Sequence, residues 1–516
     1  MPQDQDHDIL KPRRLLRGEI TYAAAKEQDA NILHALGYRD QKIKFFTHLY
    51  QNRELIKSLV AHHLGFASPD VCRVVDVEDW IHGSFNVCIR VDVVDPRGNG
   101  KQVMIRFPLP YRIGEELCPG NADEKVRCEA GTYAWLHENC STVPIPHFYG
   151  FGLSSGKTFV GLDSLPFFTR VVQRLRRWLL QTLRYPVPSF YVQNHAQERV
   201  LLGTPYIVIE YIDPSEGKML SETWEEGRFN PPWRANLFRG ISRIMLTLAQ
   251  IPLPKIGSFV VDDNGYVSLG NRPLTLEVQQ LENENIPVDV QRNSTHTCVD
   301  SFIHDTLALH ESRLRHQPNA VNSVEDGFYQ TSALTVMRSI WSCFFRRSLR
   351  QGPFFLSLTD LNQTNIFVDS NWNIVRLIDL EWACSHPVEM IHPPHWLTGQ
   401  AIDLIDADEY TTRHTEFMNS FAEEESKLDP QFRLYPIMKQ GLENGTLWYS
   451  LALTSPSALF PIFYDHIQSR FSKTHDDPGF WRFTMPYWSF NTYEFIQQKV
   501  KDKEQYDVSL REAFQS

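Results

Sequence analysis

The spacing of apolar residues changes several times along the chain, and each change predicts a different element. Between residues 21 and 65 apolar side chains recur every three or four positions, which is typical of amphipathic helices. Residues 87–94 and 102–107 instead alternate around a turn rich in Asp, Pro and Gly, which predicts a β-hairpin. Residues 1–20 show neither pattern, so we expect a flexible tail.

Helical spacing dominates further along the chain. A helix is predicted to begin at Asn121, a buried strand at Tyr206–Ile212, and mostly helical structure beyond Thr398. Antiparallel hairpins followed by many helices indicate an α+β fold. No run of 18 apolar residues occurs, so we expect no transmembrane segment.

The most informative segment is FFLSLTDLNQTNIFVDSNWNIVRLIDLEWA, residues 354–383. Asp360 and Asn365 lie five positions apart on a polar loop between apolar runs, and Asp379 lies near the end of the next apolar run. A strand–loop–strand interpretation brings all three to one edge. Phosphoryl transfer needs a carboxylate to orient the attacking hydroxyl and oxygen ligands for magnesium, and these residues supply that set. The structural alternative is a polar turn with a strand cap.

Two earlier segments suit the binding of phosphate. Gly83-Ser84-Phe85-Asn86 stands where a strand begins, and a turn of small residues lets backbone N–H groups approach an anion. Arg106 ends an apolar strand, on the face opposite Ile105 and Phe107. Glu129, on the following helix, is its natural ion-pair partner. A purely structural Arg106–Glu129 pair is the alternative.

Composition narrows the class of protein. The chain has 516 residues and a net charge of −11, which argues against a general nucleic-acid-binding protein. Its polar N-terminus lacks the apolar core of a secretory signal. The eight cysteines are scattered, as expected for a reduced, cytoplasmic protein. His386, His392 and His395 cluster, but no further ligand completes a zinc motif.

Several segments together resemble a known family. The chain is similar to the aminoglycoside phosphotransferase family of choline-kinase-like small-molecule kinases, most closely to its large fungal branch. The resemblance runs from about Thr21 to beyond Trp396. It is carried by GSFNVCIRVDV from Gly83, MIRFPLPYRIGEE from Met104, PGNADEKVRCEAGTYAWL from Pro119, LHESRLRHQPNA from Leu309, LTDLNQTNIFVD from Leu358 and IDLEWACSHPVEM from Ile378.

The resemblance implies a protein-kinase-like, two-lobed fold. Its N-lobe would hold a five-stranded antiparallel sheet and one main helix, its C-lobe would be mainly helical, and ATP would lie between them. The corresponding divisions are an N-terminal tail and helical extension at 1–70, an N-lobe at 71–212 with a helical insertion near 165–200, and a C-lobe at 213–516 containing the catalytic loop 356–383 and a C-terminal helical extension.

The resemblance also implies the chemistry, which is transfer of the ATP γ-phosphate to a hydroxyl of a small-molecule acceptor. Asp360 would be the catalytic residue, and Asn365 and Asp379 would hold Mg²⁺. Glu381 would lie close to the metal, with a simple pairing to a nearby Arg as the alternative. The nucleotide would be bound by Gly83, Ser84, Asn86, Arg106, Glu129, Glu210 and Ile212, the last two through the backbone at the inter-lobe hinge.

Two positions depart from the family pattern. Arg106 stands where the family usually has Lys, and Leu358 where it usually has His. Both keep open a pseudokinase, or a nucleotide-binding interaction module without turnover. A protein kinase is disfavoured, because no Ala-Pro-Glu activation segment follows Asp379.

Two further segments allow alternatives. The acidic residues between 403 and 425 could line a pocket for amines, although a solvated helix face is the favoured interpretation. Residues 169–184 combine arginines with an apolar stripe. This segment could be a membrane-surface or partner helix, but the pattern favours a surface helix whose apolar stripe docks on the N-lobe.

Overall fold

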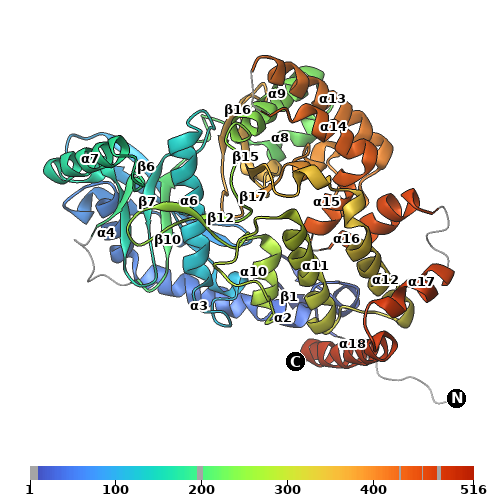
Figure 1. The fold of residues 1–516 in the computed structure, drawn as a ribbon. Coiled ribbons are helices and arrows are strands. Elements are labelled where there is room, and N and C mark those ends of the chain that lie inside the picture. The colour runs from blue at the N-terminus through green and yellow to red at the C-terminus, as the bar shows by residue number, and fades with distance from the viewer. Residues whose placement is uncertain (1–9, 195–201, 429–431, 456, 473–477, 516) are drawn as a thin grey trace.

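The computed structural model describes residues 10–194, 202–428, 432–455, 457–472 and 478–515. Its long strands precede residue 272, and the chain beyond residue 298 consists mainly of helices with a few short strands (Figure 1). The predicted α+β class is confirmed. Over the ranges described, no helix is both long and apolar enough to cross a membrane.

The largest sheet has eight strands in the described part of the chain. Its order is β3-β5-β6-β10-β7-β8-β9, and β4 pairs with β5. The expectation of five strands is wrong, because short segments at both edges satisfy their backbone groups by joining the sheet. The strands are β3 (Cys72–Val74), β4 (Ile81–His82), β5 (Asn86–Val94), β6 (Gly100–Pro108), β7 (Phe148–Gly152), β8 (Thr158–Gly161), β9 (Tyr191–Gln193) and β10 (Tyr206–Glu210).

Strand β6 shows the alternation predicted from the sequence. Ile105 and Phe107 pack into an apolar cluster with helices α3 (Tyr38–Gln51) and α4 (Arg53–His63). Met104 belongs to the cluster on the opposite side, which contains apolar residues of helix α6 (Asn121–Asn139). Arg106 shares that strand face.

Helix α6 is wedged between the sheet and the hairpin of β12 (Ser258–Val261) and β13 (Val267–Asn271). Gly131 marks the closest approach: a Cβ there would lie 2.6 Å from the carbonyl carbon of Phe259. Because the obstacle is backbone, it has little room to move. The position of α6 against β12 therefore depends on glycine at 131.

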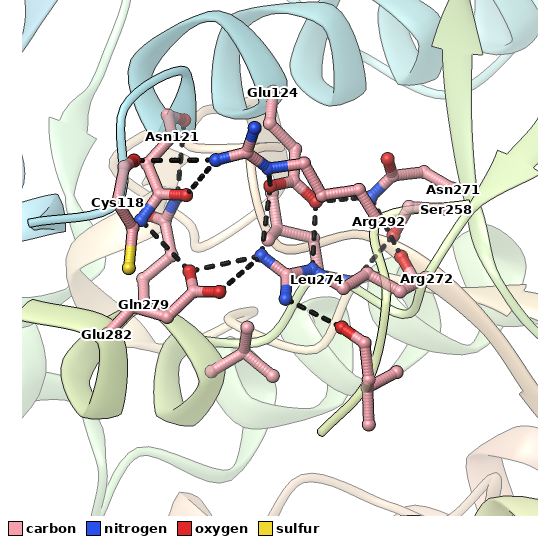
Figure 2. A network of polar contacts seen from close by, with 12 residues as sticks. Cys118, Asn121, Glu124, Ser258, Asn271, Arg272, Leu274, Gln279, Glu282 and Arg292 are labelled. Carbon is pink, nitrogen blue, oxygen red and sulfur yellow. Dashed lines mark hydrogen bonds and ion pairs between the residues drawn. The ribbon is translucent and has the colours of Figure 1, made fainter. Parts of the chain in front are cut away.

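A buried ionic network fixes the beginning of α6 (Figure 2). The Arg272 guanidinium donates to both oxygens of Glu124, at 2.9 and 3.0 Å, and to Glu282 of α10 (Leu276–Asn283) at 3.0 Å. Arg292 donates to Glu124 at 2.9 Å. This bidentate pairing holds α6, the β12–β13 hairpin and α10 in one arrangement.

Two small sheets lie among the C-terminal helices. β14 (Phe354–Ser357) pairs with β17 (Cys384–Pro387), and β15 (Ile366–Val368) pairs with both β16 (Ile374–Leu377) and β11 (Lys218–Met219). Besides α10, the α-helices from residue 220 on are α8 (Leu220–Gly227), α9 (Pro231–Leu248), α11 (Val299–His316), α12 (Val324–Ile340), α13 (Ala407–Ser426), α14 (Tyr435–Asn444), α15 (Thr446–Thr454), α16 (Leu459–Ile462), α17 (Pro478–Thr484) and α18 (Thr492–Gln515). The helical structure predicted beyond Thr398 is confirmed.

The N-terminal segment is more ordered than predicted. β1 (Arg13–Arg14) pairs with β2 (Glu19–Ile20), so a flexible tail to residue 20 is wrong; residues 1–9 lie outside the described residues. The helices that follow, α1 (Tyr22–Lys26) and α2 (Ile32–Leu36), pack on α18. The Ile32 N–H donates to the Tyr506 hydroxyl at 2.8 Å, which joins the two ends of the chain.

The predicted helical insertion forms α7 (Phe167–Thr182); residues 195–200 of that insertion lie outside the described residues. The expectation that its apolar stripe docks on the sheet is wrong. Leu175 and Trp178 are 59% and 63% exposed, whereas Arg177 pairs with Glu138 at 3.3 Å. The helix is therefore held by its polar side.

Candidate functional site

Two strand pairs, β14–β17 and β15–β16, bring Asp360, Asn365 and Asp379 together. Ile366 pairs with Leu377, so Asn365 and Ile378 lie side by side at one end of the β15–β16 hairpin. The Ile378 N–H donates to the Asn365 carbonyl at 3.0 Å, which puts the next residue, Asp379, beside Asn365. The predicted convergence at one edge is confirmed. Asp379 adopts a left-handed φ of 57°, a strained conformation for a non-glycine residue that is common at functional sites.

Asp360 is held by two amides. Asn365 Nδ2 donates to the Asp360 carboxylate at 3.0 Å and to its carbonyl at 2.8 Å, and Asn362 Nδ2 donates to the other carboxylate oxygen at 2.9 Å. Burial, and then the charges of Glu381 and Asp379, raise the pKa of Asp360 to about 7. A carboxyl group with a pKa near neutrality suits general-base chemistry.

Arg106 connects the large sheet to this edge. Its Nη1 donates to Glu129 at 3.0 Å, so the predicted ion pair is present. Its Nη2 contacts the Asp379 carboxylate and lies 3.2 Å from Glu381. Arg106 and Glu129 are buried, while the Asp379 side chain is 31% exposed. The guanidinium therefore neutralises three carboxylates, one from α6 and two from the loop after β16.

Lys125 is a member of the site that sequence reasoning missed. Its ammonium group, 1% exposed, donates to Glu381 at 2.5 Å and to Asn86 at 2.9 Å. It lies four residues before Glu129, so both side chains project from one face of α6. That spacing, Lys then Glu at i and i+4 on a predicted helix, was the available signal.

Glu381 is the common acceptor of the cluster. Its Oε2 accepts from Arg106, from Lys125 and from Asn86, the last at 2.6 Å. Burial alone would raise the pKa of Glu381, but the two cations outweigh it and lower the pKa. Glu129 behaves differently: burial, opposed by Arg106, raises its pKa to about 7. The cluster holds more carboxylates than cations, which favours an added cation.

The other predicted nucleotide-binding residues take different positions. Gly83 and Ser84 form the turn before β5, where the Gly83 N–H donates to the Asn86 carbonyl at 2.9 Å and the Ser84 carbonyl accepts from Arg112. The Asn86 side chain is occupied by Glu381 and Lys125. It therefore orients the cluster and does not face solvent in the turn.

Glu210 ends β10, and Ile212 follows two residues later. The Glu210 N–H already donates to the His147 carbonyl at 2.8 Å, so that donor is not free for an adenine ring. On the neighbouring strand, Val103 is opposite Glu210 and Arg106 is opposite Ile207. Glu210 therefore lies roughly 10 Å along the sheet from Arg106, at about 3.4 Å per residue.

A cavity of about 420 Å³ opens beside Asp360. Asp360 and Leu358 line it together with helices α9 and α11. Leu358 also packs against the main apolar core. Further apolar lining comes from Leu276, Leu309, Trp382, Met390 and Trp396.

Four histidines line the same cavity, and three of them are the predicted cluster of His386, His392 and His395. Burial lowers the pKa of His386 and of His395 to about 4 and also lowers the pKa of His392, so these rings are neutral at physiological pH. His392 Nδ1 donates to the Pro393 carbonyl at 2.9 Å. Among the described residues, no group of three or more His, Cys, Asp or Glu side chains is arranged to hold a metal ion.

The acidic residues after position 403 do not line this cavity as far as the described residues show. Asp406 caps α13, and Glu425 accepts the Leu434 N–H at 2.7 Å. Glu424 pairs with Arg243 and Lys427, at 2.8 and 2.6 Å. These contacts support the structural interpretation of the acidic run and not an amine pocket.

The oxygen donors of Asp379 and Asn365 fit a magnesium site that has only two protein ligands. Mg²⁺ takes oxygen ligands and, in phosphoryl-transfer sites, one or two protein side chains together with substrate phosphates and water. The partly exposed Asp379 carboxylate and the Asn365 amide oxygen are donors of that kind. A site with only two protein ligands needs no preformed group of three.

Comparison of the sequence with models of protein families and with curated proteins finds no match. The family resemblance therefore stays a prediction, and the function has to be argued from the residues.

Proposed function

We propose that this protein transfers the γ-phosphate of ATP to a hydroxyl of a small molecule. The observation that carries the proposal is the convergence of Asp360, Asn365 and Asp379 on the buried Arg106–Glu129 pair. A catalytic carboxylate, an amide, a second carboxylate and a fixed cation are the parts that phosphoryl transfer requires. The proposal includes a protein-kinase-like arrangement, with the nucleotide between the large sheet and the β14–β17 and β15–β16 strand pairs.

In this proposal Asp360 acts as the general base. Its carboxylate, oriented by Asn362 and Asn365, accepts the proton of the acceptor hydroxyl. The acceptor oxygen forms a bond to the γ-phosphorus, and the bond from that phosphorus to the β-phosphate oxygen breaks. ADP leaves with the electron pair. A base of pKa about 7 is matched to this task near neutral pH.

Arg106 and Lys125 supply the positive charge. Glu129 and Glu381 fix the two cations before the nucleotide arrives, so little reorganisation is needed. Asn365 and Asp379 would hold Mg²⁺, which neutralises phosphate charge when it is bound. The Arg106–Asp379 contact would have to loosen for Asp379 to act as a ligand.

The cavity beside Asp360 is proposed to hold the acceptor. Its lining is largely apolar, with neutral histidines, and contains two carboxylates besides Asp360, those of Glu277 and Asp305. Apolar walls with a few polar groups favour an uncharged, largely apolar alcohol. A polycationic aminoglycoside would find only these three carboxylates to pair with among largely apolar walls.

Turnover is the direct test. The protein is incubated with Mg-ATP and a library of alcohols that includes sterol-like, aromatic and aliphatic members, amino-alcohols, sugars and aminoglycosides, and ADP release is measured. We expect acceptor-dependent ADP release with an apolar alcohol and none with Asp360→Asn. Release that is independent of Asp360 would overturn the proposal.

The contact between Arg106 and Asp379 favours a second candidate, a nucleotide-binding module without turnover. In such a protein Arg106 would keep Asp379 occupied, and ATP would bind without magnesium. Calorimetry with and without Mg²⁺ separates the two candidates. Binding that requires Mg²⁺ supports the kinase, whereas Mg²⁺-independent binding with no ADP release supports the module.

A further inference from the structure

Helix α7 is attached to the protein by its polar side. Arg174 pairs with Asp163 at 2.7 Å, Arg177 pairs with Glu138 at 3.3 Å, and the Arg177 guanidinium lies 3.9 Å from the centre of the Phe190 ring. Arg170, Gln173, Arg177 and Leu180 are the less exposed residues of the helix, and their spacing of three to four places them on one face. That face is the attached one.

The opposite face is apolar and open. The exposed fractions are 65% for Phe167, 81% for Phe168, 61% for Val172, 59% for Leu175 and 63% for Trp178. Within the described residues, no residue of α7 is buried. Figure 1 shows the helix at the outer edge of the sheet, far from the C-terminal helices. An apolar face of this size on the surface marks an interaction site.

Charge indicates what covers this face. Residues 164–194 contain five arginines and no acidic residue, in a chain whose net charge is −11. On a helical wheel Arg174 and Arg176 flank the apolar arc on its two sides. No ion pair is found for Arg176 or Arg184 in the parts of the chain that the structure describes. Unpaired cations beside an apolar face are complementary to an anionic lipid surface.

We propose that α7 lies in the plane of an anionic lipid bilayer and anchors the protein peripherally. The 16-residue helix is about 24 Å long, and its apolar arc runs along its whole length. Phe167, Phe168 and Trp178 would enter the boundary between headgroups and acyl chains, while Arg176 and Arg184 contact lipid phosphates and carboxylates. This proposal is independent of the phosphotransferase activity.

Sedimentation of the full chain with vesicles tests the proposal. Vesicles of phosphatidylcholine alone are compared with vesicles containing about 30% phosphatidylserine. We expect sedimentation with the anionic vesicles, weaker sedimentation with neutral ones, and a loss at high salt as the charges are screened. Absence of sedimentation with anionic vesicles would overturn the proposal.

Variants localise the contact. Val172→Asp combined with Leu175→Asp should lower partitioning at least about tenfold, because two apolar side chains leave the lipid and two charges enter. Arg176→Gln should lower binding to anionic vesicles about fivefold. The matched control is Val508→Asp on α18, where the valine is 52% exposed, and binding should not change.

All three variants should unfold at the temperature of the wild type, since they alter exposed positions. The proposal would be contradicted if the double variant bound anionic vesicles as well as the wild type, or if Val508→Asp lost as much vesicle binding as the double variant. A third outcome would also contradict it: the wild type forms a dimer and does not bind vesicles, and the double variant is monomeric. That result would assign the apolar face to a protein contact.

Discussion

Lys125 and Glu381 form a buried ion pair across the candidate site, with Nζ and Oε2 2.5 Å apart. Lys125 comes from α6, and Glu381 from the loop after β16. Both side chains are 3% exposed or less. The same Glu381 oxygen also accepts hydrogen bonds from Arg106 and Asn86 of the large sheet. Glu381 therefore connects the loop after β16 to that sheet and to α6.

Lys125→Met is expected to destabilise the protein by roughly 3–5 kcal/mol, because it leaves Glu381 buried with one cation fewer. Urea denaturation measures the change. The matched control is Lys57→Met, which removes an exposed pair with Glu54 and should cost less than about 1 kcal/mol. Equal effects of the two variants would contradict a structural role for the Lys125–Glu381 pair.

Two replacements of Arg106 should show how much of the Mg-ATP affinity depends on its positive charge and how much on the shape of its guanidinium. Arg106→Ala should reduce stability by roughly 3–5 kcal/mol and weaken Mg-ATP binding, since Glu129 loses its main partner. Arg106→Lys should keep much of the affinity in a working phosphotransferase, because a cation remains. Calorimetric titration with Mg-ATP measures the affinity of both variants. Unchanged ATP affinity in Arg106→Ala would remove Arg106 from the binding site.

Asp360→Asn should lower turnover by roughly 10²–10⁴ and leave ATP binding intact, as expected for the loss of a general base. The control is Asp369→Asn in the β15–β16 turn. The Asp369 carboxylate accepts backbone N–H groups of Asn371 and Asn373, at 2.8 and 2.9 Å. That variant should affect stability more than turnover. The assignment of Asp360 fails if the two variants have equal activity.

The proposed phosphotransferase activity should depend on pH through Asp360. The protonated carboxyl cannot accept a proton, so kcat/KM should fall as the pH drops below about 7, the value to which burial and neighbouring charges raise the pKa of Asp360. A profile that is flat across about pH 5–8 would contradict this role.

The stability of the fold should depend on pH in the opposite direction from the activity. Between about pH 4, the ordinary pKa of Asp, and the raised value in the fold, folded Asp360 holds a proton that the unfolded chain has released. The contribution of Asp360 to stability is therefore present at low pH and lost as the pH rises through about 7. Asp360→Asn should lose less stability than the wild type over that range, as measured by urea denaturation at several pH values.

Gly131→Ala should destabilise the protein by roughly 1–3 kcal/mol, because the new methyl group meets the backbone of Phe259 at 2.6 Å. It should also weaken Mg-ATP binding, since a shift of α6 moves Lys125 and Glu129. Gly441→Ala is the control. Gly441 lies inside α14 with open space around it, so alanine should stabilise by about 0.5–1 kcal/mol. Similar effects of both changes on ATP affinity would show that α6 does not position the site.

The parts of the site that could be predicted are those fixed by local register. Asp360, Asn365 and Asp379 lie within one strand–loop–strand segment, so the period of the strands is enough to bring them to one edge. Arg106 and Glu129 were predictable because strand alternation and helix spacing each orient one side chain. The Lys125–Glu381 pair was not, because its partners are 256 residues apart.

Helix α7 shows a second limit of sequence reasoning. Its period established an amphipathic helix, but not which face is attached. The attachment depends on Asp163 and Glu138, which pair with Arg174 and Arg177. The edge strands β4 and β9 were missed because segments of two or three residues carry almost no periodic signal.

The cavity beside Asp360 has a kinetic consequence. It is lined by Asp360 and by helices α9 and α11, whereas Arg106 and Glu129 approach from the sheet and from α6. An acceptor in the cavity and a nucleotide near Arg106 would reach the carboxylate from different sides, so neither has to leave before the other enters. A phosphotransferase built this way would work through a ternary complex with no obligatory order of addition, and its double-reciprocal plots would intersect and not run parallel.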